Sequence, residues 1–284
     1  MQDSSTKHKH AVLITGCSTG IGYQVATDLA QRGYNVVASA RNPKDVDRLN
    51  AQGLFAVQLD LESSDSIHEA VDKTLSHTNG CLYGLFNNGA YGQAGAMEDL
   101  GRQAIQKQFE TNVIGWMELT NMIIPHMRQQ GYGRIIFNSS VLGLIALKFR
   151  GAYTASKFAI EGYADTLRLE LDNSNIFTSL IEPGPIHTNF RKNSYQMYQR
   201  YIDKENSFFK EEYLASEKRL LKKGAAVPFT LPPSAITPKV INALESRHPK
   251  ARYYVTKPTY IFGYLRRILS SKALDKLLIK VSNS

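Results

Sequence analysis

The sequence predicts an α/β fold in which helices cover both faces of a doubly wound parallel sheet of about seven strands. Short apolar segments bounded by turn residues alternate with longer segments that carry apolar residues at helical spacing. The short segments are almost continuously apolar, which is typical of strands buried on both faces. No linker rich in Gly, Ser or Pro divides the chain. We therefore expect one domain over residues 10–257 and a C-terminal helical extension over 258–284.

The expected strands are apolar runs that end in turn residues, at 11–15, 35–40, 55–59, 82–86, 133–138, 177–181 and 252–255. The expected helices lie between them, at 21–32, 43–52, 64–78, 100–130, 152–173 and 234–247. A regular alternation of this kind indicates crossover connections between parallel strands.

Residues 189–233 interrupt the alternation. The segment is rich in Tyr, Phe, Lys and Glu and is too long for a plain connection. It is either a functional lid with short helices of its own or a disordered stretch, and its aromatic content favours the lid. The aromatic residues expected to cover a site are Phe190, Tyr195, Tyr198, Phe208, Phe209 and Phe229.

The C-terminal extension has apolar residues at helical spacing opposite basic ones. One interpretation is a peripheral membrane contact through 258–280, with an apolar face in the lipid and a basic face on anionic headgroups. These faces are Tyr260, Ile261, Phe262, Leu265, Ile268 and Leu269, and Arg266, Arg267, Lys272 and Lys276. The alternative is a helix that caps the substrate pocket or a subunit interface. It is favoured because Pro258 and Gly263 interrupt the pattern.

The composition is that of a soluble globular protein, with 43% hydrophobic and 21% charged residues. Cys17 and Cys81 show no metal or redox spacing, so we expect neither a disulfide framework nor a metal site. The two cysteines fit a reducing cytoplasm best. The first apolar run is too short for a signal peptide or a membrane span.

The net charge of +9 is unevenly distributed. From residue 190 onward there are 19 Lys and Arg against 7 Asp and Glu, whereas residues 1–189 hold 15 against 18. A basic surface can meet a phosphorylated cofactor, acidic lipid or nucleic acid. Here the charges are scattered among Glu and aromatic residues, so we expect no nucleic-acid partner.

A glycine-rich turn, "TGCSTGIG", follows the first strand and contains Gly16, Gly20 and Gly22. Glycines let the backbone turn tightly and let a pyrophosphate approach the N–H groups at the start of the next helix. The second strand ends in "ASARN", where Ala40 leaves space and Arg41 offers a guanidinium to a 2′-phosphate. This pattern favours NADP(H) over NAD.

Tyr153 and Lys157 lie four positions apart in "YTASK" and therefore share one face of a helix. A fixed positive charge near a phenol favours tyrosinate, which lowers the phenol's pKa toward the range of an acid/base catalyst. On the pair alone, a packed tyrosine beside a solvated lysine is the favoured interpretation, because such pairs are common on helices.

With these motifs the chain resembles the short-chain dehydrogenase/reductase family over roughly residues 10 to 257. The family's glycine pattern appears as "TGCSTGIG", its Asn-Asn-Ala-Gly as "NNGA" with the last two residues exchanged, and its Pro-Gly turn in "EPGPIHT". The catalytic Asn corresponds to Asn112 in "ETNVIG". The catalytic Ser, thirteen positions before Tyr153, corresponds to Ser140 and not Ser139.

The resemblance implies a Rossmann-like fold and a role for each of these residues. Tyr153 is expected to exchange a proton with the substrate oxygen, and Ser140 to hold that oxygen. Lys157 is expected to bind the nicotinamide ribose, and Asn112 to position a water leading to Lys157. The residues expected to contact the cofactor are Gly16, Ser18, Thr19, Gly20, Ile21, Gly22, Arg41, Asp60, Leu61, Asn88, Gly89, Ala90, Tyr153, Lys157, Pro183, Gly184, Ile186 and Thr188.

The motifs look most like those of bacterial NADP-dependent aldehyde reductases and of hydroxysteroid and retinol dehydrogenases. A small hydrophobic aldehyde or ketone is therefore the expected substrate, and a homodimer or homotetramer the expected assembly. One alternative is an oxidative steroid, retinol or acyl-chain alcohol dehydrogenase. A catalytically idle NADP-binding regulator is disfavoured, because all four catalytic positions hold competent residues. Cys17 as a redox sensor and His187 as a substrate contact are less favoured than plain loop residues.

Overall fold

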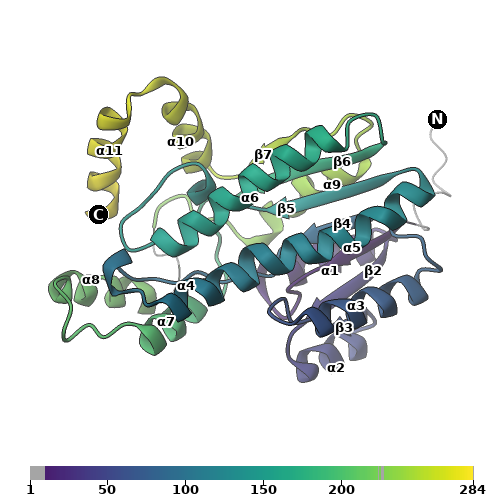
Figure 1. Cartoon of the computed structure of the whole chain (residues 1–284), viewed down its shortest axis with the longest axis horizontal. Coiled ribbons are helices and arrows are strands. Elements are labelled where there is room, and N and C mark those ends of the chain that lie inside the picture. The colour runs from purple at the N-terminus through teal and green to yellow at the C-terminus, as the bar shows by residue number, and fades with distance from the viewer. Residues whose placement is uncertain (1–9, 223, 225–226, 284) are drawn as a thin grey trace.

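The computed structural model describes residues 10–222, 224 and 227–283. Within these residues, seven parallel strands form one sheet in the order β3-β2-β1-β4-β5-β6-β7 (Figure 1). The strands are β1 (Ala11–Ile14), β2 (Asn35–Ala40), β3 (Phe55–Gln58), β4 (Gly84–Asn87), β5 (Gly133–Asn138), β6 (Ile176–Glu182) and β7 (Arg252–Tyr254). The strand order reverses between β1 and β4, which opens a crevice at the carboxyl ends of the strands. The predicted doubly wound parallel sheet is confirmed.

Helices cover both faces of the sheet, as Figure 1 shows. One core layer packs beneath α3 (Ser64–His77), α5 (Gly115–Gln130) and α6 (Gly151–Glu170). The other packs beneath α1 (Gly20–Gln31), α2 (Pro43–Ala51) and α9 (Thr237–Glu245). Successive residues of β1 alternate between the layers, with Leu13 in the first and Val12 and Ile14 in the second. Both faces of the strand are buried, which explains its continuous apolar sequence.

The helix expected over 100–130 has three parts. It consists of α4 (Arg102–Phe109), a π-helical turn at Glu110–Ile114, and α5. π-turns inside helices often mark functional positions. This turn carries Asn112, the residue that the family pattern singles out.

The insertion between β6 and α9 folds into α7 (Phe190–Tyr201) and α8 (Lys210–Leu221), joined to α9 through a short 3-10 turn at Pro233–Ala235. The two helices pack against Ala94 and Ala96 in a small core that also contains Tyr198, Tyr213 and Leu220. The segment thus has the short helices expected of a lid. Residues 223, 225 and 226 of the predicted segment lie outside the described residues.

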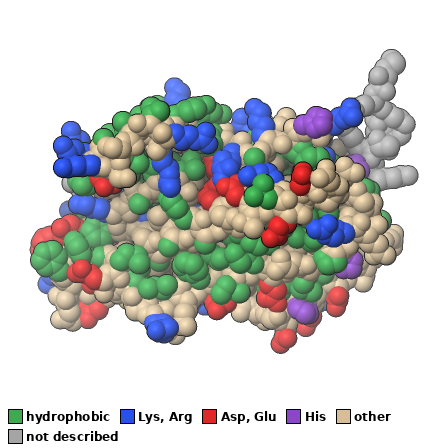
Figure 2. Space-filling view, turned by 45° about the horizontal axis from the view of Figure 1, so that its top comes forward, with side chains coloured by type: hydrophobic (Ala, Val, Ile, Leu, Met, Phe, Trp, Pro, Cys, Tyr) green, Lys and Arg blue, Asp and Glu red, His purple; other side chains and the backbone are tan. Residues whose placement is uncertain are grey.

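The C-terminal extension forms α10 (Lys257–Ile268) and α11 (Ser271–Asn283). Phe262, Leu274 and Leu278 pack into a cluster with Tyr153. The exposed apolar residues of α10 are Tyr260, Ile261, Tyr264 and Ile268. Figure 2 shows Lys and Arg side chains gathered on the upper part of the visible face. The extension therefore packs over the site, as the capping interpretation expects. None of the helices in the described part of the chain is long and apolar enough to cross a membrane.

Candidate active site

The sequence-predicted residues meet at the carboxyl ends of β1, β4, β5 and β6. The glycine turn follows β1, "NNGA" begins at the end of β4, Ser140 follows β5, and the Pro-Gly turn follows β6. Tyr153 and Lys157 reach this edge from the first turns of α6. The parallel topology thus brings together motifs that are far apart in the sequence.

The glycine turn has no room for side chains. Gly16 and Gly20 adopt positive φ angles of 71° and 68°. A Cβ added to Gly16 would lie 2.6 Å from the Cα of Gly89, and one added to Gly22 would collide with the carbonyl of Gly16. Thr19, the N-cap of α1, makes no capping hydrogen bond through its side chain. The first N–H groups of α1 are therefore not capped by the Thr19 side chain. Together with the glycine backbone they form a surface that fits the pyrophosphate of a dinucleotide.

The "NNGA" turn is tied directly to this cradle. The hydroxyl of Thr15 accepts hydrogen bonds from the backbone N–H of Asn88 and of Gly89, each 2.8 Å long. A Cβ at position 89 would lie only 3.2 Å from the backbone nitrogen of Gly16. Trp116 on α5 donates from Nε1 to the carbonyl of Gly89 over 2.8 Å. The exchanged pair of small residues thus preserves the turn and places glycine where two backbones touch.

Tyr153 is almost completely buried, with 8% of its surface exposed. Its hydroxyl shares a hydrogen bond with Ser140, and its ring lies 5.3 Å from that of Phe190. Burial raises the pKa of Tyr153 to about 12, although the hydrogen bond with Ser140 acts in the opposite direction. Neighbouring Ser139 instead donates to Glu161 over 2.5 Å. The geometry therefore distinguishes the two serines, and only Ser140 contacts the phenol.

Lys157 is completely buried and points toward the end of β5. Its Nζ donates to the backbone carbonyl of Asn138 over 2.7 Å and lies 4.4 Å from the centre of the Trp116 ring. Burial lowers the pKa of Lys157 to about 7, and the charge of Glu161 opposes this effect. The predicted lowering of the Tyr153 pKa by Lys157 is not found, because burial raises this pKa and the Nζ of Lys157 donates to Asn138 instead of the phenol.

Asn112 is buried in the π-turn, and its amide is fully engaged. Its Oδ1 accepts from the backbone N–H of Tyr91, and its Nδ2 donates to the carbonyl of Tyr91 over 2.9 Å and to the hydroxyl of Ser156 over 3.2 Å. Asn112 therefore fixes the chain that follows "NNGA" against α6. Its predicted role in positioning a water stays a prediction.

Arg41 is exposed at the end of β2, 3.8 Å from the carboxylate of Glu62. Asp60 accepts from the N–H of Glu62 over 3.1 Å. Leu61 is buried against Gly89 and the first residue of α5, and Ala90 packs on the same core layer. The guanidinium of Arg41 is therefore mostly exposed, and its ion pair with Glu62 is long.

Arg48 was not identified from the sequence. From α2 it donates to the carbonyl of Ser18 over 2.6 Å and pairs with Asp45 over 2.9 Å. It thereby braces the glycine turn and adds a second positive charge near the end of β2. The sequence signal that could have identified Arg48 is a basic residue in the helix that directly follows Arg41.

The Pro-Gly turn lies opposite the glycine turn. A Cβ on Gly20 would lie 3.2 Å from the side chain of Thr188, and Ile186 bridges to Leu231 in an isolated β-bridge. Gly184 packs so closely on the Thr256 hydroxyl that a side chain could not fit, and the carbonyl of Pro183 accepts from Val141 over 2.8 Å. These contacts place the predicted nicotinamide-side residues across the crevice from α1.

The two less favoured candidates behave as loop residues. Cys17 is buried and donates from Sγ to the carbonyl of Ile14 over 3.2 Å, and burial raises its pKa to about 12. A thiol of that kind is unreactive. His187 is exposed, and its backbone N–H donates to Leu231.

The space around Tyr153 is apolar. Its cluster contains Val141, Leu142, Ile145, Leu147, Phe190, Phe262, Leu274 and Leu278. Of the six aromatic residues expected to cover the site, only Phe190 touches the tyrosine. Tyr195, Tyr198 and Phe209 build the core of the insertion, and Phe208 and Phe229 are exposed. The missing part of the cover comes from α10 and α11.

Among the described residues, no group of three or more His, Cys, Asp or Glu could hold a metal ion. The buried donors and acceptors around Tyr153 are a phenol, a hydroxyl, an amine and an amide. Together they can transfer a proton to or from an oxygen beside a dinucleotide, which is acid/base chemistry coupled to a redox cofactor.

Comparison with known proteins gives consistent matches. The family model for short chain dehydrogenases matches residues 10–199. The uncharacterized oxidoreductase YbbO of Escherichia coli (strain K12) is 42% identical over 268 residues, which are 94% of this chain and 93% of that protein. Retinol dehydrogenase 8 of Homo sapiens is 33% identical over 256 residues, which are 85% and 79% of the two chains.

A solved structure of a short chain dehydrogenase/reductase from Burkholderia phymatum in complex with NAD has the same fold. It superposes with a TM-score of 0.76 over 95% of both chains, at 22% identity. At this identity the likeness concerns the fold alone.

Proposed function

This chain belongs to the short-chain dehydrogenase family, and we propose that it is an NADP(H)-dependent reductase of hydrophobic aldehydes or ketones. The family consists of oxidoreductases that bind nicotinamide cofactors. The observation that carries the proposal is the setting of Tyr153: a buried phenol, hydrogen-bonded to Ser140, inside an apolar cluster.

The proposed mechanism uses Tyr153 as a general acid. When bound, the reduced dinucleotide would supply the hydride to the carbonyl carbon. Because its pKa is about 12, the phenol of Tyr153 holds its proton at neutral pH and can donate it to the carbonyl oxygen. The hydroxyl of Ser140 holds the same oxygen in place. The ammonium of Lys157 lies 5.6 Å from the centre of the Tyr153 ring, and in this proposal it binds the ribose of the nicotinamide beside the phenol.

The preference for NADP(H) rests on the end of β2. Ala40 provides no carboxylate to bind ribose hydroxyls, and Arg41 and Arg48 bring two guanidinium groups near this end of the crevice. In this proposal Asp60 and Leu61 flank the adenine, whereas Asn88, Gly89, Ile186 and Thr188 hold the ribose and nicotinamide ends.

The apolar cluster around Tyr153 favours a hydrophobic carbonyl compound over a sugar, because polar hydroxyl groups would lose their hydrogen bonds there. The oxidative alternative draws support from the likeness to retinol dehydrogenase 8. In either direction Tyr153 is the proton carrier. The proposal also includes a homodimer or homotetramer in the cytoplasm.

The test is oxidation of NADPH by the purified protein with aldehydes and ketones of increasing chain length. We expect turnover that improves with chain length. Tyr153→Phe should lose about 10²- to 10⁴-fold in kcat and still bind NADPH. Tyr163→Phe is the matched control, since this tyrosine lies on the same helix and its hydroxyl only donates to Asn121. Activity of Tyr153→Phe equal to that of the control would refute the proposal.

A further inference from the structure

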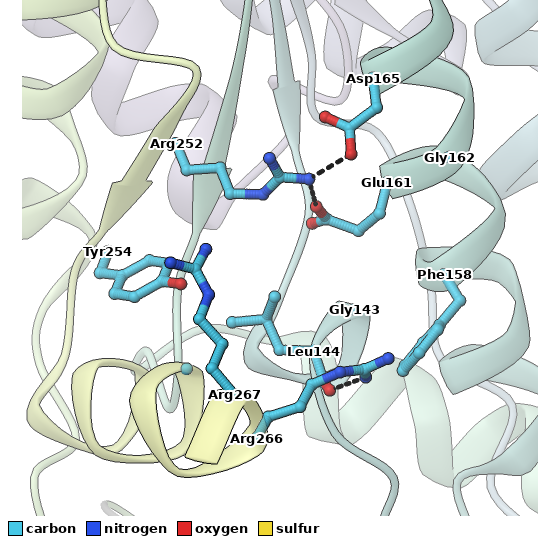
Figure 3. A pocket seen from close by; sticks show the side chains of 11 residues that line it. Gly143, Leu144, Phe158, Glu161, Gly162, Asp165, Arg252, Tyr254, Arg266 and Arg267 are labelled. Atoms are coloured by element: carbon cyan, nitrogen blue, oxygen red, sulfur yellow. Dashed lines mark hydrogen bonds and ion pairs between the residues drawn. The ribbon is translucent and has the colours of Figure 1, made fainter.

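An ionic cluster lies against the loop that carries Ser140. It forms one wall of a pocket of about 450 Å³ between α6, β7 and α10. Figure 3 shows Arg252 reaching from β7 toward Glu161 and Asp165 on α6. The proposed mechanism does not use any of these groups.

Arg252 binds three carboxyl groups. Its Nη2 lies 3.0 Å from Glu161 and 2.7 Å from Asp165, and its Nε lies 3.1 Å from Glu182. Glu182 is completely buried at the end of β6. Burial, followed by the charge of Glu161, raises the pKa of Glu182 to about 9. At neutral pH Glu182 therefore keeps its proton. Burial raises the pKa of Glu161 as well, but the hydrogen bond from Ser139 and the charge of Arg252 favour its ionised form, so the negative charge of the pair lies on Glu161.

Glu161 also holds the loop that carries Ser139 and Ser140. Its Oε1 accepts the hydroxyl of Ser139 over 2.5 Å. The loop then wraps closely over the carboxylate, since a Cβ at Gly143 would lie 3.0 Å from Glu161 and 2.6 Å from the Ser139 hydroxyl. Loss of this carboxylate would release the residue directly before Ser140.

Glu161 follows Lys157 by one helical turn, so both side chains lie on the same face of α6. Lys157 is buried, which disfavours its charged form, and the negative charge of Glu161 favours it. One carboxylate thus acts on two residues of the site, on Ser140 through the loop and on Lys157 through its charge.

Other charged groups also face this region. Asp165 is shared between Arg252 and Arg168. From α10, Arg266 bonds to the carbonyl of Leu144 and covers the Phe158 ring at 4.7 Å, and Arg267 and Tyr254 line the outer pocket. These groups are closer to solvent than Glu161, and their charges are screened more strongly.

We propose that Glu161 is a positioning residue of this active site: its carboxylate anchors the loop that presents Ser140, faces Lys157 one helical turn away, and is itself held by Arg252 beside Glu182. The inference rests on the proposed function, because that function assigns the roles of Ser140 and Lys157. It adds a residue that contacts neither substrate nor cofactor.

The chain has a built-in probe of the Lys157 charge. Its only tryptophan, Trp116, has the Lys157 Nζ 4.4 Å from the ring centre, so loss of the ammonium changes the ring's surroundings and its emission. A pH titration of tryptophan fluorescence therefore follows Lys157 without substrate or cofactor. The fluorescence transition should be absent in Lys157→Met, which would assign it to the Lys157 amine.

We expect Glu161→Gln to lower the midpoint of this transition by about one pH unit and to move the alkaline limb of kcat with it. Asp165→Asn is the matched control, because it removes a carboxylate from Arg252 without touching Ser139. Its midpoint should equal that of the wild type. Ser139→Ala keeps the Glu161 charge but removes the hydrogen bond between the loop and Glu161. The midpoint of its fluorescence transition should therefore equal that of the wild type. Its kcat should fall several-fold, with KM for NADPH unchanged.

An unshifted midpoint in Glu161→Gln, or an equal shift in Asp165→Asn, would overturn the charge role. Wild-type kcat in Ser139→Ala would overturn the anchoring role. Should Glu161→Gln not fold, Glu161→Asp decides: we expect a midpoint within about 0.3 pH units of wild type, with reduced kcat. Because the fluorescence titration needs no turnover, a protein inactive toward every carbonyl compound would refute the proposed function and leave the charge test standing.

Discussion

Lys157 donates to the backbone carbonyl of Asn138 over 2.7 Å. The side chain of the same asparagine donates to Asn88 over 2.9 Å, and Asn88 in turn donates to the carbonyl of Thr15 over 2.9 Å. Hydrogen bonds through Asn138 and Asn88 thus connect Lys157 to the glycine turn. Asn138 stands at its centre, at the end of β5.

Asn138→Ala should weaken NADPH binding about 2- to 10-fold, because one buried hydrogen bond to Asn88 is lost. The backbone carbonyl remains for Lys157, so we expect kcat at saturating NADPH to change less than the dissociation constant does. Fluorescence titration with NADPH measures the binding. Thr178→Ala on the neighbouring strand is the control, since its buried hydroxyl has no hydrogen-bond partner in the described structure. Equal affinities of Asn138→Ala and wild type would break the proposed connection.

Arg41→Asp should shift cofactor preference from NADP toward NAD. The substitution removes the exposed guanidinium and places a carboxylate at the end of β2, where it can accept from ribose hydroxyls and repels a 2′-phosphate. We expect the ratio of kcat/KM for NADPH over NADH to fall by about 10-fold or more, since a charge-assisted hydrogen bond contributes about 1.5 to 3 kcal/mol. Arg128→Asp, a matched change of charge on the exposed surface of α5, should leave the ratio unchanged. An identical ratio in both variants would remove Arg41 from the phosphate site.

The buried carboxyl of Glu182 should make stability depend on pH. Its pKa is about 9 in the folded chain, against 4.5 for an ordinary glutamate, so between these values the folded state binds more protons than the unfolded state. Its contribution to stability is complete below pH 4.5 and is lost as the pH rises through 9. Glu182→Gln keeps the shape and does not ionise.

From pH 6 to pH 9 we therefore expect Glu182→Gln to gain about 3 to 4 kcal/mol in the free energy of unfolding relative to wild type, measured with urea. Asp165→Asn shows no such trend in this range, because hydrogen bonds from Arg252 and Arg168 outweigh burial and lower the pKa of Asp165. A constant difference between Glu182→Gln and wild type would mean that Glu182 is ionised in the folded protein throughout.

The fold was predictable because the apolar pattern reports burial directly. The errors in strand boundaries occur where a residue is buried but does not pair in the sheet. Leu82 is completely buried and was counted in the fourth strand, yet β4 begins at Gly84 and ends at Asn87, a polar residue that donates to Thr120. The π-turn around Asn112 is likewise invisible in composition, since it depends on contacts with Tyr91.

Motif spacing predicted which residues would meet, but not their partners. Trp116, Asn138 and Glu161 read as ordinary residues of a helix, a strand and another helix. Their importance comes from atoms supplied by distant segments, such as the amine of Lys157 and the guanidinium of Arg252. Likewise, the pKa direction of Tyr153 follows from burial in a cluster completed by the C-terminal helices.

Leu278 and Ile279 on α11 provide a test of the apolar cover. Leu278 is 8% exposed and packs in the cluster with Tyr153, whereas its neighbour Ile279 is 48% exposed. Leu278→Ser should raise KM for a long-chain aldehyde by about 5- to 20-fold, because a lost hydrophobic contact costs about 1 to 2 kcal/mol. KM for a short-chain aldehyde and the affinity for NADPH should stay near wild type.

Ile279→Ser removes an aliphatic side chain of the same size from the next, exposed position of the helix, so it should leave KM for both aldehydes unchanged. If it raised the long-chain KM as much as Leu278→Ser, the effect would come from the exposed face. The long chain would then be taken up through the outer surface of α11, and the cluster around Tyr153 would not be the substrate's binding site.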